Sequence, residues 1–232
     1  MTSPPVALVT GANRGLGSEV CRQLAARGLT VLLGSRDLEA GTVAAKRLGV
    51  RVQSLDVTDP AGIHHARDQI AEEYGRLDVL VNNAGIFGNA VDGDLDDIRA
   101  TFAVNLFGAW QTTVAFEPLL RAGGHGRVVN VSSGVGSFGT PEGISNPRPV
   151  PPAYPVSKAA LNALTVRLAV EWRHTGILVN AACPGFIATF PGAEKLGARP
   201  IPEGAASVVW AATLPDDGPS GGLFRDGQPL PW

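Results

Sequence analysis

The sequence has only two cysteines, few charged residues and no long apolar run. Cys21 and Cys183 are far apart and match no metal or redox spacing, so we expect a reduced, cytoplasmic protein without a metal site. No apolar run approaches the roughly 18 residues that span a bilayer, and we expect no signal peptide at the start. The net charge of −2 gives no electrostatic reason to expect nucleic acid or a membrane as a partner.

The sequence does contain enough apolar residues for one folded domain. Hydrophobic residues make up 44% and charged residues 17%, a balance that disordered chains do not have. At about 100–200 residues per domain, we expect residues 1–232 to form a single domain. A chain of this length can bury about 70% of its unfolded surface, so it needs no disulfide or metal to be stable.

Short apolar runs alternate with stretches of helical periodicity along the chain. Strands buried on both faces appear as such continuous runs. The predicted strands are residues 6–10, 30–33, 50–55, 77–81, 127–131, 177–181 and 222–224. The predicted helices are one marked by Leu16, Val20 and Leu24, and five at residues 38–48, 60–74, 94–121, 153–173 and 203–213. This alternation predicts an α/β fold: a Rossmann-type, doubly wound parallel sheet of about seven strands with helices on both faces.

A glycine-rich turn with the spacing G-x-x-x-G-x-G follows the first predicted strand. Glycines permit a tight turn and let a pyrophosphate approach backbone N–H groups at a helix N-terminus. Such a turn alone is weak evidence, but its place after the first strand favours a dinucleotide site, because ligands bind beyond the carboxyl ends of these strands. The residues expected to bind there are Gly11, Asn13, Arg14, Gly15, Leu16 and Gly17.

Two further strand ends are expected to belong to the same half of the site. Asp56, followed by Val57, can accept a hydrogen bond from an adenine amino group, because Asp59 with Pro60 is the better cap for the next helix. The fourth strand ends in Asn82-Asn83-Ala84-Gly85. Its small residues allow a ribose close to the backbone, and its amides can tie the loop to neighbouring strands, so Asn82, Ala84 and Gly85 are further candidates.

The end of the second strand discriminates between the two nicotinamide dinucleotides. An acidic residue there favours NAD, and an arginine near the 2′-phosphate favours NADP. Arg36 comes first after the strand, and Arg14 can face the same phosphate. Asp37 would suit NAD, but we interpret it as the N-cap of the helix that begins at Leu38. We therefore expect NADPH, with NADH as the less favoured alternative.

Tyr154 and Lys158 are four residues apart on a predicted helix, so they lie on one face. A free phenol has a pKa near 10, and a neighbouring ammonium group is expected to lower it toward the range useful for proton transfer. Ser133 ends a strand and can hydrogen-bond a carbonyl oxygen beside Tyr154. Asn105 is polar within an apolar helix, where a satisfied buried amide is the simpler interpretation. A Pro184-Gly185 turn after the sixth strand can cover a nicotinamide.

In this order, the motifs resemble those of single-domain short-chain dehydrogenases/reductases. The resemblance covers nearly the whole chain, from Val6 to Trp232. It rests on the T-G-x-x-x-G-x-G turn, N-N-A-G, the asparagine of N-L-F-G, S-S with Y-x-x-x-K, and P-G. It implies a Tyr154 general acid, a Lys158 that lowers its pKa and holds the nicotinamide ribose, a Ser133 that orients the substrate carbonyl, and a water relay at Asn105. Further cofactor contacts are expected from Pro184, Gly185, Ile187 and Thr189.

Within that family the sequence is most similar to carbonyl reductases. The 21 residues from Ser133 to Tyr154 exceed the common family spacing, and the proline-rich segment 139–152 is expected to be stiff. A longer insert in carbonyl reductases shapes the pocket and can block tetramer packing, so a homodimer or a homotetramer stays open here. Segment 186–202 is short for a family lid, which indicates an open pocket. Candidate substrate contacts are Phe138, Phe186 and Phe190, although phenylalanine more often only packs.

The favoured function is an NADPH-dependent carbonyl reductase or alcohol dehydrogenase acting on a small molecule. A β-ketoacyl carrier-protein reductase is an alternative that needs a basic patch, for which Arg148, Lys195 and Arg199 are thin candidates. A non-catalytic cofactor sensor would be expected to lack Tyr154 or Lys158. Isomerases and dehydratases on this scaffold usually have longer chains and another glycine spacing.

Overall fold

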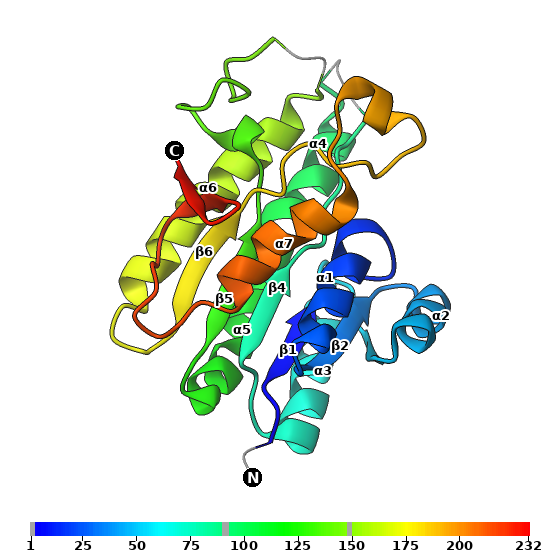
Figure 1. The fold of residues 1–232 in the computed structure, drawn as a ribbon, viewed down its shortest axis with the longest axis vertical. Helices are drawn as coiled ribbons and strands as arrows, with labels where there is room; N and C mark the ends of the chain where they lie inside the picture. Colours follow the sequence, from blue (N-terminus) through cyan, green and yellow to red (C-terminus); the bar gives the residue numbers. More distant parts are fainter. Residues whose placement is uncertain (1–2, 90–92, 148–149) are drawn as a thin grey trace.

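The computed structural model describes residues 3–89, 93–147 and 150–232. Within these ranges, one sheet has the strand order β3-β2-β1-β4-β5-β6-β7-β8 (Figure 1). Its strands are β1 (Val6–Val9), β2 (Thr30–Ser35), β3 (Arg51–Ser54), β4 (Val79–Asn82), β5 (Arg127–Val131), β6 (Leu178–Ala182), β7 (Leu223–Arg225) and β8 (Gln228–Leu230). Neighbouring strands from β3 to β7 are parallel, and β8 is antiparallel to β7.

The doubly wound α/β fold is therefore confirmed, with one strand more than predicted. The seven parallel strands agree with the expectation of about seven, and β8 was missed. It contains a proline and only three residues, so no apolar run reveals it. The turn before it is Asp226-Gly227, with φ of 53° and 76°, and this pair is a known hairpin signal that could have indicated the strand.

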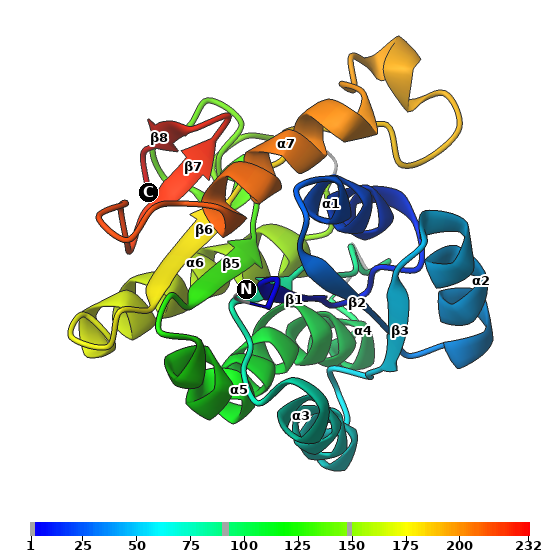
Figure 2. The same cartoon turned by 60° about the horizontal axis from the view of Figure 1, so that its bottom comes forward.

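Helices cover both faces of the sheet (Figure 2). The α-helices are α1 (Gly15–Ala26), α2 (Leu38–Leu48), α3 (Pro60–Tyr74), α4 (Leu95–Phe102), α5 (Ala109–Gly123), α6 (Ala153–Glu171) and α7 (Ile201–Ala212). Helices α1, α2 and α7 lie on one face, and α3, α4, α5 and α6 lie on the other (Figure 2). The helix predicted at 94–121 is interrupted by the π-helical segment η1 (Ala103–Gly108).

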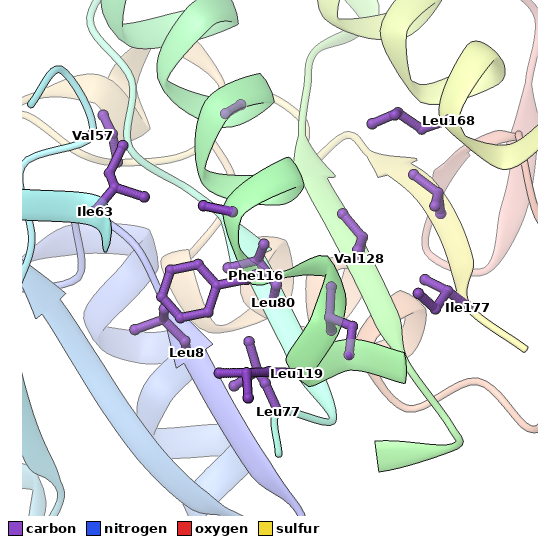
Figure 3. Close-up of a cluster of buried hydrophobic side chains, with 14 of the residues drawn as sticks. Leu8, Val57, Ile63, Leu77, Leu80, Phe116, Leu119, Val128, Leu168 and Ile177 are labelled. Carbon is purple, nitrogen blue, oxygen red and sulfur yellow. The ribbon is translucent and has the colours of Figure 1, made fainter. Parts of the chain in front are cut away.

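The strands are apolar throughout because alternate residues enter two different cores. In β1, Val6 and Leu8 belong to the core beneath α3, α5 and α6, whereas Ala7 and Val9 belong to the core beneath α1, α2 and α7. Phe116 of α5 is fully buried and points toward Leu8 and Leu80 of the strands (Figure 3). Burial on both faces fixes the register of the sheet, and with it the place where each strand ends.

Helix starts and strand order then place the functional loops. Asp37 accepts a hydrogen bond from the backbone N–H of Ala40 at 3.0 Å, and Asp59 accepts one from Ala61 at 3.0 Å, so both predicted caps are confirmed. From β1 the chain winds outward to β2 and β3, then crosses back to β4 on the other side of β1. The carboxyl ends of β1 and β4 therefore flank the point where the strand order reverses, which is where such sheets bind ligands.

Candidate active site

The glycine turn and the loop after β4 are locked together at this point. Gly11 has φ of +60°, and a Cβ there would lie 2.8 Å from the Cα of Ala84. Thr10 Oγ1 accepts hydrogen bonds from the backbone N–H groups of Asn83 and Ala84, each at 3.0 Å. Asn83 Nδ2 returns a hydrogen bond to the carbonyl of Thr10 at 2.8 Å. Glycine at position 11 is therefore required by close packing as well as by its positive φ.

The remaining residues of the predicted turn open α1. A Cβ at Gly17 would lie 2.5 Å from Asn83 Nδ2, so this glycine too allows the two loops to meet. Leu16 is buried in the core beneath α1, so only its backbone can face a ligand. Gly15 has φ of +56°, and Thr189 Cγ2 is 4.0 Å from an ideal Cβ at this position. The segment after β6 thus reaches across to the glycine turn.

Asn82 does not face the turn. Its Nδ2 donates to Thr113 Oγ1 at 2.7 Å and to Asn130 Oδ1 at 2.8 Å, beneath α5. Any contact of Asn82 with a cofactor would therefore come from its backbone. The sequence correctly suggested that the amides of this loop tie strands together, and the buried side chain carries out that role.

The adenosine end of the candidate site has cations without ion-pair partners. Among the described residues, neither Arg14 nor Arg36 forms an ion pair, and both side chains are exposed. A hollow of about 370 Å³ adjoins Asn13 and the outer face of α2. It is lined by Asn13, Asp37, Glu39, Ala40, Val43, Ala44 and Arg47. Asp37 and Glu39 would repel the 2′-phosphate of NADP, whereas Arg47 would attract it. The hollow alone therefore does not discriminate between NAD and NADP.

Asp56 and Val57 end the segment after β3. Asp56 Oδ1 accepts from the backbone N–H of Thr58 at 2.9 Å and from its hydroxyl at 2.7 Å, so one of the two carboxylate oxygens holds the local turn. Val57 is buried against η1, where a Cβ at Gly108 would lie 2.7 Å from Val57 Cγ2. Val57 therefore fixes the loop by packing.

Ser133, Tyr154 and Lys158 meet where β5 ends and α6 begins. Tyr154 and Lys158 lie in the first turns of α6, with Pro155 between them, and Ser133 caps the short 3₁₀ helix η2 (Gly134–Gly136). Lys158 is buried, its Nζ donates to the carbonyl of Val131 at 2.8 Å, and it lies 5.7 Å from the centre of the Tyr154 ring. The structure therefore brings together the three residues that the sequence placed in one site.

Burial determines the charge state of these groups. It raises the pKa of Tyr154 above its ordinary value; the nearby Cys183 raises it further, and a hydrogen bond from Ser133 opposes the rise. Burial lowers the pKa of Lys158 to about 8, against an opposing effect of Cys183. The direction for Tyr154 is opposite to the one that the Tyr–Lys spacing predicts, because the lysine is directed at Val131 and desolvation dominates.

Asn105 lies in the π-helical segment, a feature often found at functional sites. Its Oδ1 accepts from the backbone N–H of Ile86 at 2.8 Å, and its Nδ2 donates to the carbonyl of Ile86 at 2.8 Å and to Ser157 Oγ at 3.0 Å. Gly85 lies between it and Lys158, since an ideal Cβ there would be 3.4 Å from Asn105 Oδ1 and 3.7 Å from Lys158 Nζ. Asn105 thus joins the loop after β4 to α6, as a satisfied buried amide does.

The segment after β6 forms the opposite wall. Pro184 and Gly185 follow the strand, and a Cβ at Gly204 of α7 would lie 2.5 Å from Ile187 Cγ2. Ile187 forms a bridge with Arg199, and the 3₁₀ helix η3 (Ala193–Leu196) lies between them. The rings of Phe186 and Phe190 are 6.4 Å apart and both are about half exposed. Phe138 is 76% exposed, so it offers surface without a packed wall.

Phe87 is a candidate that the sequence reasoning missed. Its ring stacks on that of Tyr154, with centroids 4.3 Å apart and an interplanar angle of 26°, and it is 59% exposed. It follows Gly85 of the N-N-A-G motif by two residues. The sequence feature that could have indicated Phe87 is a large aromatic residue close to the glycine that follows β4.

A polar cluster beneath Ser133 was also missed. Cys183 is buried, and its Sγ accepts from the backbone N–H of Gly134 at 3.1 Å and from Arg225 Nη2 at 3.1 Å. Arg225 Nη2 also donates to the carboxylate of Glu142. The sequence reasoning interpreted Cys183 as simple small-residue packing, because its partners come from the turn after β5 and from β7, which are distant in the sequence.

Other surface features lie apart from these residues. A larger hollow of about 670 Å³ lies between α5 and α6, and none of the predicted catalytic or cofactor-binding residues lines it. Of the basic patch considered for a carrier protein, Arg148 lies outside the described residues and Arg199 is paired with Asp226 at 2.8 Å. Across the described ranges, no helix is both long and apolar enough to cross a membrane.

Comparison with known proteins decides the family. A family model described as short chain dehydrogenase matches residues 5–196. The chain belongs to the short-chain dehydrogenase/reductase family. It is 35% identical to a (+)-neomenthol dehydrogenase of Arabidopsis thaliana, over 97% of both chains, and 34% identical to carbonyl reductase [NADPH] 1 of Mus musculus, over 100% of this chain and 99% of the relative.

Solved structures agree with this family assignment. Salutaridine reductase from Papaver somniferum superposes with a TM-score of 0.81 at 30% identity, covering 96% of this chain and 99% of the other. Menthone neomenthol reductase from Mentha piperita gives 0.80 at 30% identity, covering 98% and 100%. This short-chain dehydrogenase is therefore an oxidoreductase of the alcohol/carbonyl type. The alignment with the Arabidopsis relative runs over 291 positions against 232 residues here, so that relative contains residues that this chain lacks.

Proposed function

We propose that this short-chain dehydrogenase uses NADPH to reduce the carbonyl group of a small molecule to an alcohol, with Tyr154 as the general acid. The supporting observation is the meeting of Tyr154, Ser133 and the buried Lys158 just beyond β5, across from the glycine turn after β1. A phenol, a hydroxyl and an ammonium group in one partly dry site are suited to protonating a carbonyl oxygen.

The chain's own residues handle the proton. When bound, the nicotinamide supplies a hydride to the carbonyl carbon. Ser133 donates a hydrogen bond to the carbonyl oxygen, and Tyr154 gives its phenolic proton to that oxygen as negative charge develops there. Because burial raises the pKa of Tyr154, the phenol is protonated at neutral pH, as a general acid must be.

Lys158 and Asn105 act behind the tyrosine. Below its pKa of about 8 Lys158 is charged, and the ammonium group then favours the phenolate that proton transfer leaves behind. The same group can donate to the hydroxyls of the nicotinamide ribose. Asn105 holds the loop at Ile86 and is proposed to anchor the water relay that returns a proton toward Lys158.

The glycine turn, the loop after β4 and the segment after β6 are proposed to hold the cofactor. The backbone of Gly11, Gly15 and Gly17 lies at the start of α1, whose dipole favours a pyrophosphate. Arg36 and Arg14, both exposed and without ion-pair partners among the described residues, are proposed to bind the 2′-phosphate. The name of the mouse relative, carbonyl reductase [NADPH] 1, supports this preference.

A compact, apolar ketone fits the surroundings of Tyr154 best. The exposed ring of Phe87 stacks on the tyrosine itself, and the half-exposed pair Phe186 and Phe190 belongs to the segment after β6 that is proposed as the opposite wall. The names of the plant relatives refer to neomenthol and menthone, which are compact apolar molecules of this kind. Menthone, aromatic aldehydes, diketones and quinones form a suitable panel, and a thioester-linked ketone tests the carrier-protein alternative.

Tyr154→Phe is the direct test of the mechanism. It keeps the ring but removes the proton, so NADPH-dependent reduction of the best panel substrate should fall by about 10²–10⁴-fold while NADPH still binds. The control is Tyr74→Phe, because Tyr74 is the chain's other tyrosine and its hydroxyl has no hydrogen-bond partner in the described structure. Near-normal turnover by Tyr154→Phe would exclude Tyr154 as the acid.

Arg36→Ala tests the cofactor assignment. Loss of a charge-assisted hydrogen bond to phosphate should raise the Kd of NADPH by about 10–100-fold and leave that of NADH unchanged. Both values can be measured by titrating the fluorescence of the reduced cofactors. Arg51→Ala is the control, since Arg51 pairs with Glu73 at the start of β3, away from the cofactor loops. Equal weakening of both cofactors would contradict the 2′-phosphate role.

A further inference from the structure

The sulfur of Cys183 is the centre of a polar cluster directly below the catalytic turn. Its three donors are the backbone N–H of Gly134 at 3.1 Å, the backbone N–H of Gly185 at 3.4 Å and Arg225 Nη2 at 3.1 Å. Sulfur is a weak hydrogen-bond acceptor. Three donors directed at one buried thiol therefore indicate that the surrounding backbone and side chains are held in fixed positions. Two of those donors belong to the loops that carry Ser133 and the Pro184-Gly185 turn.

Arg225 connects this sulfur with segment 139–152. It is the last residue of β7, its side chain is 28% exposed, and the same Nη2 group donates to the Glu142 carboxylate. A planar guanidinium presents several donors in fixed directions, so one side chain can hold two acceptors on different segments. Glu142 also balances the charge, without which a half-buried arginine would be costly.

The ion pair lies against the backbone of the residue that follows Ser133. A Cβ at Gly134 would be 2.5 Å from Glu142 Oε1 and 2.9 Å from Arg225 Nη2, so only glycine allows this approach. The same turn is held on other sides. Thr140 Oγ1 donates to the Gly134 carbonyl at 2.8 Å, and Ser137 Oγ donates to the carbonyl of Pro231 at 2.7 Å.

We propose that Arg225 is a positioning residue for carbonyl reduction, which fixes the turn bearing Ser133 by holding Cys183 and Glu142 at once. The proposal rests on the proposed function, because Arg225 is argued to hold Ser133 Oγ where it can act with Tyr154 in carbonyl reduction. A hydroxyl that must meet a carbonyl oxygen and a phenol together tolerates little displacement, and a misplacement of about 1 Å can cost about 10²-fold in rate. The hairpin of β7 and β8 therefore supports the reaction without touching the substrate.

The test compares Arg225→Met and Arg225→Lys with the wild type, using NADPH and the best substrate of the carbonyl panel. Arg225→Met keeps much of the side chain's length but loses its donors, so kcat should fall by about 10–100-fold. The Kd of NADPH should change much less than kcat, since no described contact joins Arg225 to the glycine turn and Gly185 is only one of the groups proposed to hold the cofactor. Arg225→Lys restores the charge and a donor, and should recover part of kcat.

Arg127→Met is the matched control. Arg127 is also a strand arginine paired with an acid, Asp216 at 2.7 Å, but it begins β5 at the opposite end of the strands. Its loss should lower Tm and leave kcat of the folded fraction unchanged. If Arg225→Met folds poorly, Glu142→Gln removes the ion pair more gently and should also lower kcat at constant NADPH affinity.

Variants of Cys183 provide an independent test of the same proposal. Cys183→Ala removes the acceptor and should lower kcat, whereas Cys183→Ser restores an acceptor for Gly134 and Arg225 and should recover activity. Wild-type kcat in Arg225→Met, or a loss that only follows Tm as in Arg127→Met, would overturn the positioning role. A wild-type protein that reduces no carbonyl would contradict the proposed function, and this inference with it.

Discussion

Lys158 is in an environment very different from that of its free amino acid. Its ammonium group is buried at the end of β5 and donates to one backbone carbonyl, and burial lowers its pKa from 10.5 to about 8. Lys158 is therefore charged at neutral pH but close to losing its proton. Any contact that depends on the ammonium group, with a ribose hydroxyl or with the tyrosine, must weaken at moderately alkaline pH.

The pH dependence of cofactor capture follows from this pKa. kcat/KM for NADPH reports groups of the free enzyme, so it should be level below about pH 8 and fall about tenfold per pH unit above it. A profile from pH 6 to 10 at saturating carbonyl substrate measures it. The control is Lys46→Met, at an exposed position of α2, which should leave the alkaline fall of kcat/KM unchanged. A level profile up to pH 10 would show that the charge of Lys158 is not needed.

Stability should change in the same pH range. The folded protein releases the Lys158 proton near pH 8, whereas the unfolded chain keeps it up to about 10.5. Between these values the unfolded state binds more protons, so this residue's contribution to the free energy of unfolding increases as the pH rises. Below about pH 8 both states are charged, and the cost of burying the charge is present in full.

Thr10 shows how two loops become one element of the site. Its hydroxyl accepts two backbone N–H groups of the loop after β4, while Asn83 returns a hydrogen bond to the carbonyl of Thr10. Thr10 itself is buried at the end of β1. The side chains of Thr10 and Asn83 therefore fix the spacing between the glycine turn and the N-N-A-G loop.

Thr10→Val should separate these loops while keeping the shape of the side chain. The N–H of Ala84 loses its acceptor, whereas the N–H of Asn83 keeps its hydrogen bond to the carbonyl of Val81, so at about 1–3 kcal/mol for an unsatisfied buried group the free energy of unfolding should fall by about 1–3 kcal/mol. Urea unfolding measures the loss, and the Kd of NADPH should rise as well. Thr10→Ser keeps the hydroxyl and is the control. An unchanged urea midpoint for Thr10→Val would mean that packing alone holds the loops.

Elements with a local signal could be predicted from the sequence. The runs at 6–10 and 77–81 are strands because both faces are buried, and Asp37 and Asp59 cap helices as their side chains favour. The π-helical turn at Asn105 has no such signal, since it depends on how the loop at Ile86 meets α6. The same is true of the stacking of Phe87 on Tyr154, which joins residues from two loops.

At the scale of the whole molecule, the strand order determines which motifs lie together in the candidate site. Motifs that follow β1, β4, β5 and β6 meet because parallel strands end at one edge, and the reversal at β1 and β4 opens that edge. This meeting could be predicted because it follows from alternation and the usual handedness of crossovers. The contacts of Arg225 could not, because they depend on an edge hairpin and on segment 139–152.

The position of the β7–β8 hairpin also gives the protein an order of assembly during synthesis. Most of the loops proposed to hold the cofactor follow β1, β2, β3 and β4, so the strands that set them leave the ribosome early; the segment after β6 follows later. The turn bearing Ser133 is fastened by Arg225 and Pro231, which come later in the sequence than these strands. During synthesis the strands that set most of the nucleotide loops are therefore available before the hairpin that fastens the turn bearing Ser133.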